Sequence, residues 1–459
     1  MRLVYKLKNK RRRSVGPKER KDLARLFTTG IYGYLDLVLI GWTLGLLWLG
    51  GCALLTKGGW KEKLRAALTD ERLLFGGWGG EVRVQAGSWL FVAAIALLQF
   101  DMFFMNSYVR ETTASWYGFL APKLEIIYFW LIILKLVFFT RYSGLQLGAG
   151  YCFFFVFRWV FLNNGQFWTV AGMMFFLAAK DVRLRQVLKT GLAVSAASFL
   201  AVVVASKLGW ISSVVYAGEA GRQRNSFGYG WYNLTGAILL AICIMYICWR
   251  QVKNLKWFDF ALLAAALVFC DQGPDSRAAT VCIALLILLV AVLRFAPALA
   301  KPVWVRGLVS AAPAAAFAAS LLSGLLYRAD SGFWTRLDGL FTGRLMLANQ
   351  ALTGSSIAIA GQRLTDSGFV VDNFYVAQWI YGGPVESLLL WGAVTVLLWR
   401  LMKKGAVTES ACLVVMLAHA FMEGHFAWPC INVCLWLLPC VLYLLPRERT
   451  PDFAKPAAE

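Results

Sequence analysis

Long runs of apolar residues, separated by short polar segments, follow one another along most of the chain. A helix needs about 20 apolar residues to cross a bilayer. The runs predict spanning segments at 31–56, 87–106, 122–139, 145–163, 165–179, 190–208, 233–250, 257–270, 278–295, 304–326, 376–400, 407–423 and 428–446. Two of these runs, 165–179 and 257–270, are short for a span, so we expect about 12 transmembrane helices, between 11 and 13. The pattern predicts an all-α, polytopic integral membrane protein.

Composition and charge agree with this class. The chain has 459 residues, of which 59% are hydrophobic, and its formal net charge is +21. The basic residues fall in short clusters between apolar runs, as the positive-inside rule predicts for cytoplasmic loops. We therefore assign the charge to membrane topology and expect no nucleic-acid partner. None of the ten cysteines belongs to a CxxC pair, which argues against a zinc site or a disulfide framework.

Clusters of lysine and arginine determine the expected topology from Lys180 onward. Successive clusters are separated by two spans, so all of them should be cytoplasmic. The clusters lie at 180–189, 250–256, 294–306, 400–404 and 447–449. The outer face then receives 209–232, 271–277, 327–375 and 424–427.

The first third of the chain fits this rule less well. Residues 1–30 form a basic tail, expected to be cytoplasmic and to contact anionic headgroups. Counting spans back from Lys180 places 57–86 inside but this tail outside. Either 31–56 is re-entrant or partly interfacial, or one middle span is miscounted. We expect four parts: the tail at 1–30, an additional membrane or interfacial segment and loop at 31–86, the main transmembrane domain at 87–446, and a cytoplasmic tail at 447–459.

The expected outer-face segments contain arginine but no lysine. The arginines are Arg222, Arg224, Arg277, Arg328, Arg336, Arg344 and Arg363. A guanidinium binds phosphate through two parallel hydrogen bonds and keeps its charge when partly buried. This bias therefore indicates a phosphorylated lipid bound at the outer face.

The segment 327–375 is long for a connection between two spans, and such connections are usually functional or disordered. Apolar residues recur at helical spacing from Leu337 to Leu352. We expect an amphipathic helix there, broken or capped near Thr342 and Gly343, on the bilayer surface.

Two clusters of candidate residues precede spans in the middle of the chain. The first is the segment 224–233, which reads Arg-Asn-Ser-Phe-Gly-Tyr-Gly-Trp-Tyr-Asn and offers glycines for close approach and aromatic faces for sugars. Its alternative is a tight interfacial loop with belt aromatics. The second is Asp271 with Asp275-Ser276-Arg277, an anion site at a helix start or a structural Asp275–Arg277 pair.

Two further clusters lie in and after the long segment. Asp338 with Thr342-Gly343-Arg344 suits a phosphate at a helix start, or is a solvated helix face. Asp372-Asn373-Phe374-Tyr375 offers a general base with orienting donors, unless Asp372 is an N-cap. Glu423 and His425 are further acid–base candidates.

The order of these motifs resembles that of Wzy-type polymerases of capsular polysaccharides and exopolysaccharides, in the O-antigen polymerase and ligase superfamily. Residues 224–233 resemble the family signature R-Y-S-L-G-F-G-H-P-N. The family also shows a later Arg at a span start, an L-T-G-R helix, D-N-x-Y, and an E followed by N. Matching positions here are Arg277, 340–344, 372–375, Glu423 and Asn432. The chain departs from the signature at Trp231-Tyr232, where the family has His-Pro.

The resemblance implies the all-helical fold of lipid-linked glycan polymerases. It also implies a metal-independent glycosyltransferase, without cofactor, in the bacterial cytoplasmic membrane. The enzyme would join undecaprenyl-diphosphate-linked oligosaccharide repeat units at the outer face, among membrane lipids, with a flippase and a chain-length regulator as possible partners in cell-envelope assembly. The alternatives are a ligase that transfers the glycan onto another acceptor and, in a different class, a lipid-linked glycan transporter or flippase.

On this interpretation the residues divide into two roles. Asp372 would be the base that accepts the proton of the acceptor hydroxyl, with Glu423 as the second candidate and Tyr375 as a further catalytic residue that orients sugars. Arg224, Arg277 and Arg344 would bind the diphosphate. The other expected substrate-binding residues are Arg222, Ser226, Asn233, Asp338, Asn373 and His425.

Overall fold

A computed structural model describes residues 31–55, 59–75, 80–112, 116–217, 223–363, 371–443 and 445. The chain is predominantly helical. The long helices are α3 (Ile31–Leu55), α5 (Gly80–Met105), α7 (Trp116–Phe138), α8 (Gly144–Asn164), α10 (Leu184–Lys207), α11 (Tyr232–Arg250), α12 (Trp257–Gln272), α13 (Arg277–Phe295), α14 (Val303–Leu326) and α18 (Gly383–Lys404). Shorter helices are α4 (Trp60–Thr69), α6 (Val109–Thr112), α9 (Phe167–Ala178), α15 (Gly332–Leu340), α16 (Arg344–Gly354), α17 (Phe374–Ala377), α19 (Val407–Ala420) and α20 (Pro439–Leu442).

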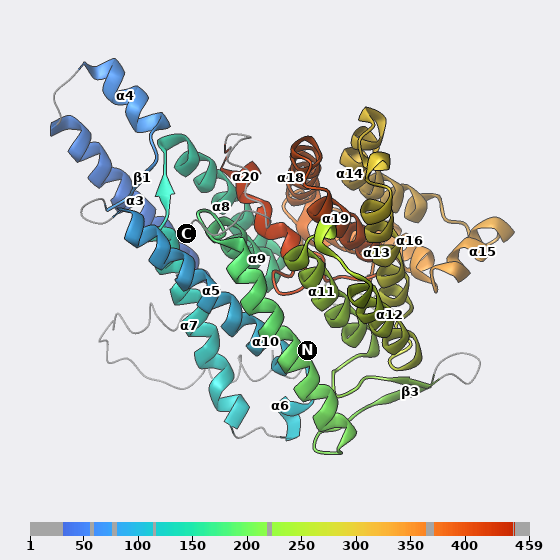
Figure 1. Cartoon of the computed structure of the whole chain (residues 1–459). Coiled ribbons are helices and arrows are strands. Elements are labelled where there is room, and N and C mark those ends of the chain that lie inside the picture. Colours follow the sequence, from blue (N-terminus) through green and yellow to red (C-terminus); the bar gives the residue numbers. More distant parts are fainter. Residues whose placement is uncertain are drawn as a thin grey trace, which may run out of the picture.

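Two short antiparallel pairs of strands accompany the helices, and only the second is a hairpin. Strand β1 (Arg72–Leu73) pairs with β2 (Arg141–Tyr142), and β3 (Val215–Ala217) pairs with β4 (Gln223–Asn225). Figure 1 shows the β3–β4 hairpin and α6 at the lower end of the molecule and α4 at the opposite end. Helices α5 and α10 finish, and α11 and α13 begin, at the lower end, which we call the site end.

Helix α10 joins two groups of helices by packing against both α5 and α11. On one side α5 packs on α7 and α10, and on the other α13 packs on α11, α12 and α19 (Figure 1). Apolar side chains fill the space between the groups and form one continuous buried cluster. Most of the bundle therefore shares one hydrophobic core, and a smaller buried cluster lies between α16 and residues 376–380. The polar hairpin β3–β4 lies at one end.

Seven helical segments in the described residues are long and apolar enough to cross a membrane, which agrees with an all-α membrane protein. They are Gly80–Met105, Gly144–Asn164, Leu184–Lys207, Tyr232–Arg250, Arg277–Phe295, Val303–Leu326 and Phe374–Lys404. Other predicted spans are shorter as helices: α9 has 12 residues, α12 has 16 and α19 has 14. The expected count of about 12 spans therefore stays a prediction.

The predicted span 428–446 is wrong as a continuous helix. The described chain makes turns up to Ile431, then a 3₁₀ helix η6 (Val433–Leu437), and then α20. Pro429 and Pro439 lack a backbone N–H, and each proline ring prevents the preceding turn from continuing as an α-helix. The segment is buried by neighbouring helices, so its side chains are mostly apolar. This apolar composition is why its sequence resembles that of a span.

Helix α3 is a member of the bundle. Tyr34 stacks on Phe129 with ring centroids 5.0 Å apart, and Gly41 and Gly45 lie against Val137 and Leu74. Helix α3 therefore runs parallel to α7, away from the site end. The same direction was expected from counting predicted spans back from Lys180, which places the start of this helix outside and 57–86 inside. The basic tail at 1–30 and the C-terminal tail at 447–459 lie outside the described residues.

Candidate functional site

A polar pocket of about 320 Å³ opens at the site end of the bundle. Its wall is built from the β3–β4 hairpin, the first turns of α11 and α13, the turn before α16, and the chain just before α17. The lining residues are Ala217, Arg224, Tyr232, Asn233, Asp275, Arg277, Ala278, Thr342, Arg344 and Asp372. Five of the predicted site residues, separated by up to 148 positions in the sequence, therefore meet in one cavity.

Arg224 lies on strand β4 and is held by two partners. Its Nε donates to Asp275 Oδ2 at 3.3 Å, and its Nη1 donates to the Tyr232 hydroxyl at 2.8 Å. The guanidinium also lies 4.9 Å from the centre of the Tyr232 ring. The expected Asp275–Arg277 pair is replaced by this Asp275–Arg224 pair. The side chain is thereby held at the pocket wall in one orientation.

Arg277 is the first residue of α13 and is exposed to the pocket. Within the described ranges it has neither a hydrogen bond nor an ion pair through its side chain. The preceding residue, Ser276, makes no side-chain cap, and the N-terminal dipole of the 19-residue helix adds positive potential. The pocket therefore contains an uncompensated positive charge at this point.

Arg344 is the first residue of α16 and is tied to the loop after α19. Its Nη2 donates to Glu423 Oε1 at 2.9 Å, and its Nε donates to the Met422 carbonyl at 2.7 Å. Asp372 Oδ2 lies 3.8 Å from the same Nη2. One guanidinium therefore stands between two carboxylates, and its position depends on both.

The two carboxylates differ in burial and access. Glu423 lies three residues beyond the end of α19, is 5% exposed, and does not line the pocket. Burial raises the pKa of Glu423 to about 7, although Arg344 opposes the shift. Asp372 lines the pocket, and burial raises its pKa as well, again against Arg344. Asp372 is therefore the carboxylate that a bound molecule can reach.

Four predicted site residues support the backbone instead of lining the pocket. Ser226 Oγ accepts from the Val214 N–H at 3.1 Å. Asp338 Oδ1 accepts from the Leu345 and Met346 N–H groups at 2.8 and 3.1 Å. Asn373, and not Asp372, is the N-cap of α17. Tyr375 is fully buried and donates to the Leu417 carbonyl at 2.9 Å.

Ser226, Asp338 and Asn373 accept from free N–H groups at turns and helix starts, as short polar side chains commonly do, whereas the Tyr375 hydroxyl donates to a carbonyl of α19. All four side chains therefore have structural hydrogen bonds, and the substrate-binding or catalytic roles expected for them stay predictions. Asp338 acts on the site indirectly, since its two bonds fix the first turn of α16, where Arg344 lies.

His425 lies in the turn after α19 and does not line the pocket. Burial lowers its pKa to about 4, so the ring is neutral at pH 7. Its ring packs edge-on against Trp428, with centroids 4.7 Å apart. His425 therefore lies outside the pocket wall, and the substrate-binding or acid–base role expected for it stays a prediction.

The other arginines of the predicted outer face do not contribute to the pocket wall. Arg328 lies before α15 and Arg336 lies within it, and both are exposed. Arg363 packs against Gly165. Arg222 lies outside the described residues. Of the seven arginines expected at the outer face, Arg224, Arg277 and Arg344 line the pocket, and the arginine bias alone could not distinguish them from the others.

Tyr232 and Thr342 are pocket residues whose roles the sequence did not reveal. Tyr232 begins α11, and its hydroxyl is a partner of Arg224. Thr342 Oγ1 accepts from Arg344 Nη1. Both residues belong to the motifs 224–233 and Thr342-Gly343-Arg344, but only the fold of the hairpin and of the turn before α16 directs their side chains into the cavity.

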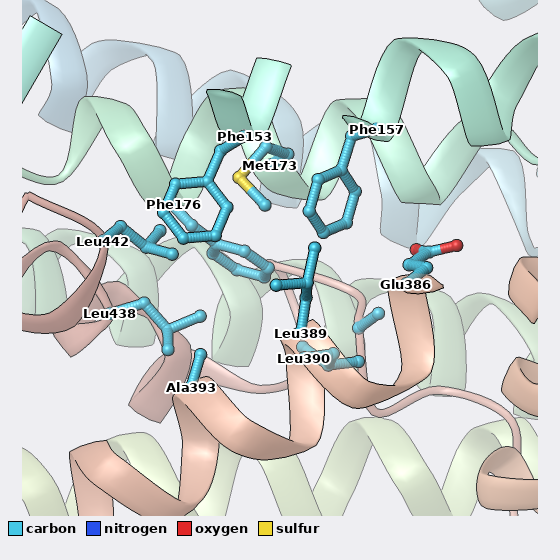
Figure 2. Close-up of a pocket in the computed structure, with 11 residues that line it drawn as sticks. Phe153, Phe157, Met173, Phe176, Glu386, Leu389, Leu390, Ala393, Leu438 and Leu442 are labelled. Carbon is cyan, nitrogen blue, oxygen red and sulfur yellow. The ribbon is translucent and has the colours of Figure 1, made fainter. Parts of the chain in front are cut away.

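A second cavity has a different character. Figure 2 shows it between α8, α9, α18 and α20, where aromatic and aliphatic side chains such as Phe153, Phe157 and Leu390 surround it and Glu386 lies at its edge. It holds only about 20 Å³ and contains none of the predicted site residues. It is a small apolar space between packed helices, whereas the arginine pocket is lined mainly by polar side chains.

Among the described residues, no group of three or more His, Cys, Asp or Glu side chains is arranged to hold a metal ion. Comparison of the chain with protein-family models, characterised proteins and solved structures gives no match. The functional argument for this membrane-embedded helical protein therefore depends on the pocket and on the motifs that form it.

Proposed function

We propose that the protein is a polysaccharide polymerase that joins polyprenyl-diphosphate-linked oligosaccharides at the outer face of a bacterial cytoplasmic membrane. One observation carries the proposal: three arginines from three separate segments, Arg224, Arg277 and Arg344, line one pocket beside a reachable carboxylate. Guanidinium groups that surround a cavity suit a diphosphate, whose oxygens accept paired hydrogen bonds. The resemblance to Wzy-type polymerases supports the same assignment.

In the proposed reaction, the diphosphate of the donor lies among the arginines. An acceptor sugar hydroxyl attacks the anomeric carbon of the donor glycan, and the bond from that carbon to the diphosphate oxygen breaks. The bonding electrons leave with the polyprenyl diphosphate, whose added charge the arginines stabilise. Asp372 takes the hydroxyl proton, and its raised pKa makes it a stronger base than an ordinary aspartate.

Glu423 has a positioning role in this scheme. Its buried carboxylate holds Arg344 at 2.9 Å and does not line the pocket, so it acts on the substrate through that arginine. In this scheme Asp372 is the base, and Glu423 acts by positioning Arg344. Arginine supplies the positive charge that a divalent cation supplies in many sugar-nucleotide enzymes.

Incubation of the purified protein in nanodiscs with a polyprenyl-diphosphate-linked repeat unit tests the proposal. We expect a ladder of longer lipid-linked glycans, with free polyprenyl diphosphate released in proportion and no effect of a chelator. Asp372→Asn should abolish the ladder while leaving donor binding intact.

Absence of released diphosphate lipid, or loss of product on chelation, would contradict the proposed chemistry. Transfer of the glycan once, onto an acceptor without a lipid diphosphate, would instead identify a ligase with the same pocket. Movement of an unchanged lipid-linked glycan across the bilayer would identify a transporter.

A further inference from the structure

Beside the arginine pocket, three aromatic side chains follow one another without interruption: Tyr232, Tyr216 and Trp231. We call them the aromatic row. The Tyr216 ring meets the Tyr232 ring edge-on, with centroids 5.5 Å apart, and stacks on Trp231 with centroids 6.0 Å apart and planes inclined by 21°. Tyr232 also lines the pocket, so the row begins at the cavity and leads out of it.

The hairpin fixes the row relative to the arginines. Tyr216 on β3 pairs directly with Arg224 on β4, and the Tyr216 hydroxyl donates to the Gly230 carbonyl at 2.9 Å. Arg224 in turn donates to the Tyr232 hydroxyl. The aromatic faces and the pocket are therefore parts of one rigid unit, and a ligand held by Arg224 has a fixed position relative to the row.

Trp231 ends the row and is 64% exposed. Tyr216 covers one face of its indole, so the exposed area comes from the other face and the edge. A flat, exposed aromatic face adjoining a polar pocket is suited to a ligand with one apolar face and polar edges.

A sugar ring has this character, since its C–H face stacks on an aromatic ring while its hydroxyls remain hydrogen-bonded at the edge. The chain attached to a pocket-bound diphosphate must leave the cavity along one of its walls. The aromatic row is continuous with the wall formed by Tyr232.

We propose that the aromatic row binds sugar residues of the glycan that is attached to the pocket-bound diphosphate. Trp231 and Tyr216 supply the stacking faces, and Arg224 and Tyr232 join the sugar site to the diphosphate site. This inference rests on the proposed function and extends it, because it assigns the part of the ligand that lies outside the pocket.

Binding to two probes separates this inference from the proposed function. The probes are a short-chain polyprenyl diphosphate and the same lipid carrying a disaccharide of N-acetylglucosamine, each titrated against the full chain in nanodiscs. We expect the wild type to bind the sugar-bearing probe about tenfold more tightly, given the size of one aromatic stacking contact.

Trp231→Ala should remove this gain and leave binding of the sugar-free probe unchanged. Trp231→Phe should keep most of the tighter binding of the sugar-bearing probe, because an aromatic face remains. Trp210→Ala is the matched control: Trp210 is 69% exposed near the same end of the bundle but is not a member of the row. Its loss should alter neither affinity.

Equal weakening of both probes by Trp231→Ala, or no change in either, would overturn the inference and indicate a membrane-interface residue. Binding of the sugar-free probe by the wild type without any gain from the sugar would also overturn it, while leaving the diphosphate site intact. Failure of the wild type to bind either probe would overturn the proposed function itself.

Discussion

The three pocket arginines differ in whether their guanidinium groups are paired with carboxylates of the protein. Arg224 is paired with Asp275, and Arg344 lies between Glu423 and Asp372. Arg277 has no such partner in the described part of the chain. A ligand phosphate therefore competes with carboxylates at two of the arginines but not at the third.

Arg277→Ala should consequently lower donor affinity without lowering stability. Loss of a hydrogen bond to a charged group corresponds to about tenfold to hundredfold weaker binding. The unfolding temperature should stay at the wild-type value, because no described residue loses a partner. Arg277→Lys should recover only part of the affinity, since an ammonium lacks the paired donor geometry.

Arg328→Ala is the matched control for this prediction, because Arg328 is an exposed arginine of the same end that does not line the pocket. Titration with a polyprenyl diphosphate gives the affinities, and thermal unfolding gives the stabilities. An Arg277→Ala variant that bound as tightly as Arg328→Ala would remove Arg277 from the site.

Glu423 makes stability depend on pH. Its pKa is about 7 in the folded protein and near 4.5 when exposed, so the folded state holds the proton more tightly. The free energy of unfolding should therefore be highest below about pH 4.5 and fall as pH rises toward 7, by a few kcal/mol from this group.

Glu423→Gln cannot ionise and should reduce this dependence. Thermal unfolding of the two proteins at pH 5 and pH 8 measures it, with the difference between the two pH values as the quantity compared. We expect a smaller drop for Glu423→Gln than for the wild type. An equal drop would mean that another group controls the titration.

At the scale of single elements, the turn between α15 and α16 decides where Arg344 points. Thr342 and Gly343 have φ angles of 55° and 81°, in the left-handed region, and Asp338 caps the next helix from the preceding one. The sequence predicted a break at this place from its Thr-Gly pair. It could not predict that the break aims an arginine at a loop 79 positions later.

Gly343→Ala should destabilise the protein by about 1 kcal/mol, because an alanine is strained at this φ. It should also weaken donor binding by displacing Arg344. Gly339→Ala is a matched control in the same segment: both glycines have open space around them, but Gly339 lies within α15 at a helical φ.

Unfolding temperature and donor affinity, measured on both variants, test this expectation. Gly339→Ala should be neutral or slightly stabilising, since alanine favours helix over glycine. Similar behaviour of the two variants would show that the left-handed turn does not position Arg344.

At the scale of the whole molecule, the arrangement of the helices places all pocket segments at one end. Lys180 and β2 lie at the opposite end, where Lys180 Nζ donates to the Arg141 carbonyl at 2.6 Å. The distribution of lysine predicts that this opposite end is cytoplasmic. If the Lys180 end faces the cytoplasm, the pocket at the other end of the bundle faces the outside.

Labelling with a membrane-impermeant maleimide checks this orientation. In intact cells Arg328→Cys should react, whereas Lys253→Cys should react only after the membrane is permeabilised. The described native cysteines are buried except Cys152, so the unsubstituted chain gives the background. The opposite labelling pattern would place the pocket in the cytoplasm and contradict the proposed use of an outer-face substrate.

Apolar run length depends only on local sequence, so the sequence predicted an all-α membrane protein, and seven long apolar helices agree with it. The distribution of lysine and arginine also predicted one end of the bundle as the place of the site. Of the proposed residues, Arg224, Arg277, Arg344 and Asp372 lie together in one pocket, and their functional roles stay predictions.

Which of these side chains share a cavity, and which already have hydrogen-bond partners, depends on the folded arrangement of the helices. Asp338, Asn373 and Tyr375 carry the same kinds of polar atoms as the pocket residues, yet backbone groups use them. The bonds of Asn373 and Asp338 are local, whereas the Tyr375–Leu417 and Arg344–Glu423 bonds join segments far apart in the chain. Those contacts depend on how the helices pack, and no local pattern records them.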